Sequence, residues 1–485
     1  MNSLGPILRP MSLLMLAGLA LAGWPRVAGA AETATPPEPV PIASGAPIAA
    51  VANTPTKGGA ESARASESLE ATSGVPWNPP SAISRRRGWE QAVLLPGRII
   101  SLPLSGLGYV TDQTLGYVEA KDLLAKFSFT AKHLPERAGF SIKPAHLGSG
   151  SGLGGTLSLH TPFLSGTLKN RVRADFSMTL RQYNQTLVTV QGRPARLQYG
   201  YDWRPEERFY GFGVGARESD AAGYASQSEF LRGSMRKAWN RDTENSPPRT
   251  ELNVWAGPRT SVTRTGRQDG VISFDERFPA LGPNTLDRRV EHLIYGGNFS
   301  TDWRVGAQRW ESGWRVRVQG ERFDRPLALT ALRIGRAQGA QFTRLVYETE
   351  TGFSSMRDPR SLRFLVRVMD QSITSDGHRF LLSDMARLGG RDGLAGFPTG
   401  RFHDLDLLLT RISYVYPIVR RLELDLHSEW GGVYSNVWDD PRLNTLQNSF
   451  GIAVRGRRRE GPLGSLGVDF SREGAQVRFS IGGLE

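Results

Sequence analysis

Four ionisable side chains in one stretch of the chain have the spacing of groups that act together. They are Glu423, Asp425, His427 and Glu429. Each is separated from the next by one residue, so an extended strand would place all four on one face. Carboxylates beside an imidazole could transfer protons or bind a cation. His427 has no second histidine at ligand spacing, so we predict no metal site. We prefer the simpler interpretation that these groups line the wet interior of a barrel.

Two other patterns of catalytic or cofactor-binding type lack the context that they need. Residues 150–155 read GSGLGG and match the G-x-G-x-x-G string of dinucleotide-binding turns. That string binds nucleotides between a strand and a helix, but residues 156–163 alternate as a strand, so a hairpin turn is the better interpretation. No serine occupies a nucleophile-elbow sequence. We therefore predict no cofactor and no enzymatic activity.

The elements that would position the four ionisable groups are predicted to be strands. Leu408, Ile412 and Tyr414 share one face of the preceding strand, and Arg411 lies on the other. The same alternation of apolar and charged positions recurs in segments 171–180, 196–203, 295–303, 314–321, 362–368, 450–455, 466–471 and 477–481. A soluble β-sandwich also alternates, but its strands are shorter and carry fewer charges on the polar face. The sequence predicts an all-β fold, a transmembrane antiparallel β-barrel with lipid outside and water inside.

Composition limits the compartment and the partners. The 485 residues include no cysteine, which excludes disulfides, thiolate metal sites and a lipid anchor on cysteine. After the N-terminus, no stretch approaches the roughly 20 apolar residues of a membrane helix, so strands must provide any further membrane spans. The formal charge of +13 could suit nucleic acid, but for an exported chain we expect phosphate-bearing outer-leaflet lipids or a solvated lumen to balance the charge instead, and no nucleic acid.

Three segments are predicted to precede a barrel formed by residues 138–485. Residues 1–30 have a weakly basic start, a short apolar run and a small-residue cleavage site, which predicts a signal peptide. Residues 31–84 are rich in Pro, Ala and Ser and predict a disordered periplasmic linker. Residues 85–137 show roughly helical apolar spacing and predict a short helical periplasmic segment. That segment is either a plug or membrane-surface helix, or a packing element that closes the barrel mouth.

The stretch from residue 389 to residue 432 resembles the bacterial surface antigen family, the barrels of the BamA/TamA outer-membrane assembly superfamily. In that family the sixth extracellular loop carries Gly-Gly and then an aliphatic-Arg-Gly-aromatic tetrapeptide that folds back into the lumen. The corresponding residues here are Gly389, Gly390, Leu394, Ala395, Gly396 and Phe397. Ala395 thus stands where the family has its arginine.

In the family, the loop arginine pairs with the acid of an aromatic-x-Asp-x-Gly motif on the second strand after the loop. His427, Glu429 and Gly431 occupy the matching positions, so a glutamate replaces the aspartate. The resemblance implies that the loop still contacts this acid.

A carboxylate in a confined space needs a cation nearby, because leaving it unpaired and buried costs on the order of several kcal/mol. Arg391 and Arg401 lie on the same loop, and we predict that Arg391 approaches Glu429. The alternative is that Glu429 is hydrated in a wide lumen and pairs with strand arginines such as Arg411.

Further features extend the resemblance. Residues 208–213, RFYGFG, are similar to the family's Phe-Tyr-Gly-aliphatic-Gly segment, and five alternating strands follow the loop. The resemblance implies about sixteen strands. The family's periplasmic POTRA domains have no room between residues 30 and 137.

The first and last strands are predicted to meet in a weak seam. Pro144 in the first strand cannot donate to the ladder, and Gly482 and Gly483 weaken the last one. Phe479 is expected to replace the family's terminal aromatic residue. A weak seam is what lateral opening into the bilayer would require.

The resemblance implies a protein of the cell outer membrane, with a periplasmic N-terminal segment, that assists insertion or translocation of proteins there. Its partners would be outer-membrane lipids, client outer-membrane or exported proteins, and a periplasmic companion. The lack of POTRA domains favours an alternative, a passive pore or structural barrel. A third hypothesis, an outer-membrane enzyme acting on lipid, rests only on the lumenal carboxylates and His427.

Overall fold

The computed structural model describes residues 139–481 apart from 146–153, 164–169, 193, 240–249, 267–269, 282–285, 305–311, 326–336, 339, 355–359, 375–380, 420–421, 440–442 and 459–460. The predicted signal peptide, linker and helical segment all lie outside the described residues. Among those residues, no helix is long and apolar enough to cross a membrane.

Nearly all regular structure is antiparallel strand. The strands are β1 Gly139–Ala145, β2 Gly154–Phe163, β3 Asn170–Thr179, β4 Asn184–Gln191, β5 Ala195–Phe209, β6 Ala222–Trp239, β7 Thr250–Thr265, β8 Ile272–Ser273, β9 Arg288–Asp302, β10 Gly313–Asp324, β11 Ala337–Gln338, β12 Phe342–Ser354, β13 Ser361–Ile373, β14 Ala386–Leu388, β15 Phe402–Asp404, β16 Asp406–Val419, β17 Leu422–Tyr434, β18 Gln447–Arg458, β19 Gly461–Ser471 and β20 Gly474–Ile481. The helices are short: η1 Glu218–Asp220, α5 Phe274–Arg277, η3 Leu382–Asp384, η4 Gly390–Asp392 and η5 Leu443–Thr445.

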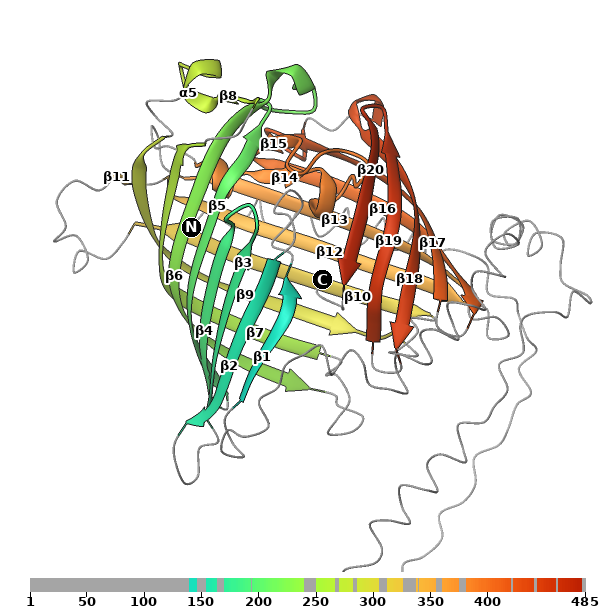
Figure 1. The fold of residues 1–485 in the computed structure, drawn as a ribbon, viewed down its shortest axis with the longest axis horizontal. Coiled ribbons are helices and arrows are strands. Elements are labelled where there is room, and N and C mark those ends of the chain that lie inside the picture. The colour runs from blue at the N-terminus through green and yellow to red at the C-terminus, as the bar shows by residue number, and fades with distance from the viewer. Residues whose placement is uncertain are drawn as a thin grey trace, which may run out of the picture. The chain divides into compact units, whose positions relative to one another are not determined.

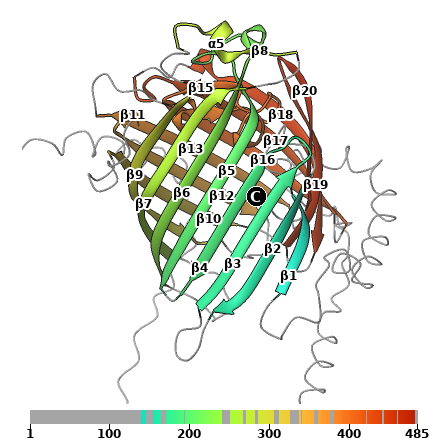
Figure 2. The same ribbon diagram turned by 60° about the vertical axis from the view of Figure 1, so that its left-hand side comes forward.

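One sheet of 18 strands forms the wall, and β14 and β15 form a separate two-stranded sheet. In the wall, β8 and β11 are two residues long and pair in parallel with β6 and β9. The remaining sixteen strands form a meander in which each pairs antiparallel with its neighbours along the chain. Figures 1 and 2 show these strands tilted and curving around the wall of the barrel. The prediction of an all-β antiparallel fold with about sixteen strands is confirmed.

The two faces of the wall differ as the alternation predicts. On β16, Ser413 is 8% exposed and pairs with the buried His427 of β17, whereas the adjacent Ile412 is 36% exposed. Large apolar side chains are exposed on the outer face of many strands, among them Phe176, Met178, Leu197, Leu231, Met235, Val254, Phe299, Phe450, Leu466, Val477 and Phe479. Large apolar side chains exposed on so many strands suit contact with hydrocarbon, because in water they would stay hydrated at a cost in free energy.

The first and last strands of the meander each have one ladder partner among the described residues. Within the described ranges, β1 is paired with β2, β20 is paired with β19, and no ladder joins β1 to β20. Figures 1 and 2 both place β1, in cyan, and β20, in dark red, at the borders of the same opening in the wall. Pro144 lies opposite Gly155 in the β1–β2 ladder, and Gly482 and Gly483 lie outside the described residues. Closure at this seam stays a prediction.

The connections place the long loops on one side of the barrel. The segment between β13 and β16 and the segment between β7 and β9 lie on the same side as α5, which Figure 1 shows above the strand ends. Long extracellular loops and short periplasmic turns are typical of outer-membrane barrels. The strand predicted after GSGLGG is confirmed as β2, so the nucleotide-binding interpretation lacks the helix that it requires.

Candidate functional site

Residues 386–404, which we call the lumenal loop, form a folded apolar unit on the inner side of the wall. Their sheet pairs Ala386 with Asp404 and Leu388 with Phe402. The loop and the inner faces of β16 and β17 share one buried cluster: Ala386, Leu388, Leu394, Phe397, Phe402, Leu407, Leu409 and Val433. Burying a Leu or Phe side chain contributes about 1.5–3 kcal/mol, so this cluster is a strong attachment of the loop to the wall.

Glycines allow the loop to turn sharply and to approach the wall closely. Gly389 and Gly393 have φ values of 118° and 119°, which other residues rarely adopt, and the Gly389 N–H donates to the Gly393 carbonyl at 2.7 Å. A Cβ at Gly396 would lie 2.5 Å from the backbone of Phe470 on β19. Beside Gly396, the Ser471 hydroxyl donates to the Gly396 carbonyl at 2.7 Å. The Gly-aromatic half of the motif therefore contacts the strand next to the last one.

Glu429 contacts the loop through the backbone. Its Oε2 accepts a hydrogen bond from the Ala395 N–H at 2.7 Å and from the Ser449 hydroxyl at 3.1 Å. Because the donor is a main-chain group, the contact does not depend on the side chain at position 395. An alanine can therefore occupy this position while the acid still holds the loop.

The cation described beside Glu429 is Arg411, whose Nη1 lies 3.6 Å from Glu429 Oε1. The side chain of Arg391 lies outside the described residues, so its predicted pairing with Glu429 stays a prediction. Gly431 faces the loop, and a Cβ there would lie 2.8 Å from the Leu408 carbonyl and 3.2 Å from Leu388. Close packing thus explains why glycine suits position 431.

Arg401 joins three parts of the molecule. Its side chain is fully buried, its Nε donates to Glu473 in the β19–β20 turn at 2.8 Å, and its Nη2 donates to the Ala216 carbonyl at 2.7 Å. Its guanidinium also lies 4.8 Å from the ring centroid of Tyr210. One guanidinium therefore connects the lumenal loop, the β5–β6 connection and the last hairpin, a role that its planar fork of donors permits.

The RFYGFG segment meets the lumenal loop at His403. The Gly213 N–H donates to the His403 carbonyl at 2.9 Å, and Phe212 and His403 form a parallel bridge. The rings of Phe209 and His403 lie 5.3 Å apart. Phe209 also belongs to a second buried cluster, with Ala222, Tyr224, Phe274, Leu286 and Leu382. The two segments that carry the sequence resemblance are thus in contact.

The four ionisable residues of β17 face inward, and three of them are buried in an ion-pair network. His427 Nε2 lies 2.7 Å from Asp469 on β19, and Asp469 also contacts Arg478 at 3.3 Å. Asp425 pairs with Arg455 and lies 3.6 Å from Arg411. A Cβ at Gly451 would lie 2.0 Å from the Asp469 carboxylate and 2.4 Å from His427 Nε2, so a larger residue there would displace this pair.

This network explains the spacing of the acids without catalysis. Arginines pair with Asp425 and Asp469, and His427 lies between these two carboxylates. In the part of the chain that the structure describes, no group of three or more His, Asp or Glu residues could hold a metal ion. The arrangement fixes the inner wall across β16–β20.

Comparison with known proteins supports the fold. No protein-family model and no curated protein matches the sequence. Among solved structures, BamA from Haemophilus ducreyi lacking POTRA domains 1–3 matches with a TM-score of 0.50 and 11% identity, over 71% of this chain and 69% of that one. CdiB from Acinetobacter baumannii matches with a TM-score of 0.42 and 11% identity, over 72% and 60% of the two chains. CdiB from Escherichia coli matches with a TM-score of 0.44 and 12% identity, over 72% and 63%.

The fold is therefore that of the BamA-type barrels, and the resemblance drawn from the motifs is confirmed at this level. This chain spans less than two thirds of either CdiB chain. The sequence named Arg401 only as a second loop arginine that could approach Glu429, and the structure pairs it with Glu473 instead. Four further residues that organise the site were not singled out from the sequence: Glu473, Ser471, Asp469 and Arg478. Glu473 gives no signal in the sequence, because it lies in an ordinary polar turn.

Proposed function

We propose that this chain is an outer-membrane barrel that assists the insertion of proteins into the outer membrane, or their translocation across it. The observation that carries the proposal is the contact of the lumenal loop with the last hairpin, in a BamA-type sheet whose first and last strands share no ladder among the described residues. A client strand could pair with a free edge of β1 or β20, because an unpaired edge in lipid leaves backbone groups unsatisfied.

The lumenal loop distinguishes this proposal from a passive pore. A pore needs a water-filled path, whereas the loop brings Leu394, Phe397 and Phe402 into the interior on the long-loop side. The partners would be outer-membrane lipids and client outer-membrane or exported proteins. A periplasmic companion that delivers clients would be a further partner.

The test uses the purified protein folded into lipid vesicles. Addition of an unfolded client barrel should give a folded, protease-protected client faster than in empty vesicles. Steady ion conductance without client folding would instead support the passive pore. Release of fatty acids or headgroups from the vesicle lipid would support the lipid-acting enzyme.

Because the chain contains no cysteine, introduced pairs of cysteines can test whether the seam between β1 and β20 opens. One cysteine in β1, scanned along Gly139–Ala145, is combined with one in β20, scanned along Gly474–Ile481. A pair that crosslinks should stop client insertion when oxidised and restore it when reduced. If no pair crosslinks, the predicted closure is wrong, and if the crosslinked protein still inserts clients, the seam is not the route.

A further inference from the structure

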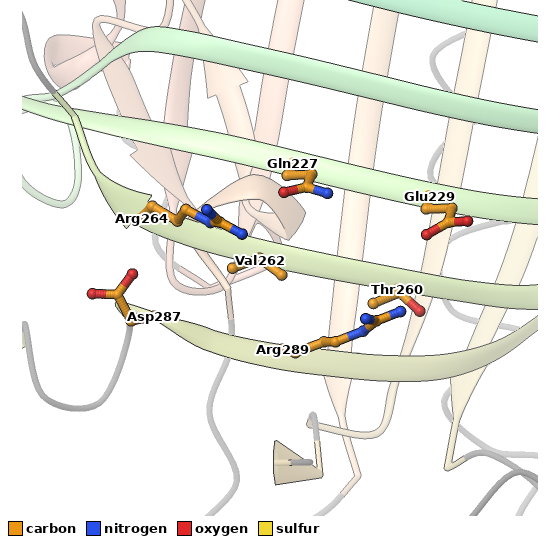
Figure 3. A pocket seen from close by; sticks show the side chains of 7 residues that line it. All are labelled: Gln227, Glu229, Thr260, Val262, Arg264, Asp287 and Arg289. Atoms are coloured by element: carbon orange, nitrogen blue, oxygen red, sulfur yellow. The ribbon is translucent and has the colours of Figure 1, made fainter. Parts of the chain in front are cut away.

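A polar hollow lies in the wall near the long-loop end of β6, β7 and β9. Its volume is about 220 Å³. Figure 3 shows the side chains that line it: Gln227, Glu229, Thr260, Val262, Arg264, Asp287 and Arg289. None of these residues takes part in the contacts of the lumenal loop described above.

The hollow opens on the outer face of the barrel. Glu229 is on the same face of β6 as Leu231 and Met235, which are 44% and 55% exposed, because residues two apart on a strand share a face. The ladders then place Thr260 opposite Glu229, and Arg289 opposite Val262, on that same outer face. A ligand of this hollow would come from the membrane side, not from the lumen.

The hollow lies directly at the border of the apolar exterior. On β6 the outer face changes from Glu229 to Leu231 within two residues, and on β9 it changes from Arg289 to the exposed Tyr295 and Phe299. A charge on the lipid face is strongly destabilising at the bilayer midplane but costs little near the interface. A cluster of charges at this border therefore marks the level of the lipid headgroups.

The groups in the hollow suit a phosphate-bearing ligand. Arg264 has no carboxylate within ion-pair distance among the residues with described side chains, and its guanidinium lies 6.0 Å from the Trp203 ring. Arg289 lies a long 3.7 Å from Glu291. Guanidinium groups bind phosphate bidentately. Glu229, which accepts from the Tyr199 hydroxyl at 3.0 Å, and Asp287 add acceptors for sugar hydroxyls.

We propose that this hollow binds the phosphorylated sugar headgroup of a membrane lipid, with Arg264 and Arg289 as the phosphate ligands. The proposal requires that the barrel spans a membrane, and it does not depend on any insertion activity. Bound lipid would fix the depth of the β5–β9 part of the wall in the membrane. This part is separate from β19 and β20, which the lumenal loop contacts.

The test measures lipid that stays bound to the folded protein. The full chain is folded in detergent with a phosphorylated glycolipid, and retained lipid is counted by native mass spectrometry. The double variant Arg264→Gln, Arg289→Gln should retain at least on the order of tenfold less of this lipid than the unaltered protein, a loss of about 1.4 kcal/mol in binding free energy, because both guanidinium contacts to the phosphate are removed. The same glycolipid without its phosphate should bind the unaltered protein as weakly.

The matched control is Arg322→Gln on β10. Arg322 shares the outer face with Tyr295, its ladder partner, but its guanidinium is engaged by Thr343 at 3.0 Å and Asp324 at 3.6 Å. This variant should retain the lipid in full, and its folding and that of the double variant are checked by heat-modifiable migration.

Three results would overturn the proposal: equal retention by the double variant, an equal loss in the control, or equal binding of the dephosphorylated lipid. Displacement of the lipid by an equal concentration of inorganic phosphate would also overturn it, because the site would then recognise free phosphate. If the double variant does not fold, the comparison of the two lipids on the unaltered protein still decides.

Discussion

Arg401 and Glu473 form an ion pair, with 2.8 Å between Nε and Oε2, that connects the lumenal loop to the turn of the last hairpin. The two residues are 72 positions apart in the chain. Arg401 is 1% exposed and Glu473 12%, so water screens the pair little. Among the described strands, β20 pairs with β19 alone. The ion pair therefore gives β20 a second attachment, to the lumenal loop.

We expect Arg401→Met to lower the free energy of unfolding by about 3–5 kcal/mol, because it leaves Glu473 unpaired near the loop. Glu473→Gln should cost a similar amount, and the double variant should cost less than the sum. The measurement is the loss of heat-modifiable folding with rising temperature. Glu229→Gln, on the outer face and far from the loop in the ladder order, serves as the control. Additive losses would show that the two residues act separately.

A second prediction concerns Glu429 and the cation that neutralises it. The structure places Arg411 at 3.6 Å, so Arg411→Met and Glu429→Gln should be non-additive by about 0.5–3 kcal/mol. Glu429→Gln alone should keep the loop in place, since an amide oxygen can still accept from the Ala395 N–H. Non-additivity with Arg391→Ala instead would support the partner predicted from the sequence.

Gly396→Ala should destabilise the folded barrel, because a Cβ there would lie 2.5 Å from the backbone of Phe470, which cannot move as a side chain can. We expect a cost of about 1–3 kcal/mol, as in other overpacked sites. Gly215→Ala is the matched control, since nothing lies within 4 Å of a Cβ at that position. Equal unfolding temperatures for the two variants would contradict the close packing of the loop on β19.

His403 should make stability depend on pH. Burial, with a smaller contribution from the charge of Arg387, lowers the pKa of His403 to about 3. In the unfolded chain a histidine has a pKa of about 6.5. As the pH falls from about 6.5 to about 3, the unfolded chain takes up a proton that the folded protein does not, so this contribution to stability is lost.

The measurement is the urea midpoint of unfolding in detergent at pH 7 and pH 4.5. His403→Phe keeps an aromatic ring beside Phe209 and cannot titrate, so its midpoint should fall less between the two pH values. An equal fall in both proteins would assign the pH dependence to other groups.

The sequence by itself determined the strands and their faces. A period of two residues is a property of the extended backbone, so Ile412 and Ser413, or Leu426 and His427, had to lie on opposite faces in any sheet that contains them. The same period of two argued against a dinucleotide site. The residues after GSGLGG alternate between apolar and polar as in a strand, whereas that site needs a helix there. The motif residues from Gly389 to Phe397, with Glu429 and Gly431, were located through the family resemblance, by matching residue types and their order along the chain.

Only the tertiary structure decided which groups meet. Glu429 contacts the Ala395 N–H, and a backbone donor leaves no mark in a sequence. Arg401 reaches Glu473, and His427 reaches Asp469, because strand order and register bring distant segments together. The close approaches at Gly396 and Gly451 also depend on what lies opposite: the backbone of Phe470 at one position, and the side chains of Asp469 and His427 at the other. Local alternation is set by the geometry of one strand, whereas these contacts are set by the arrangement of many strands around the wall.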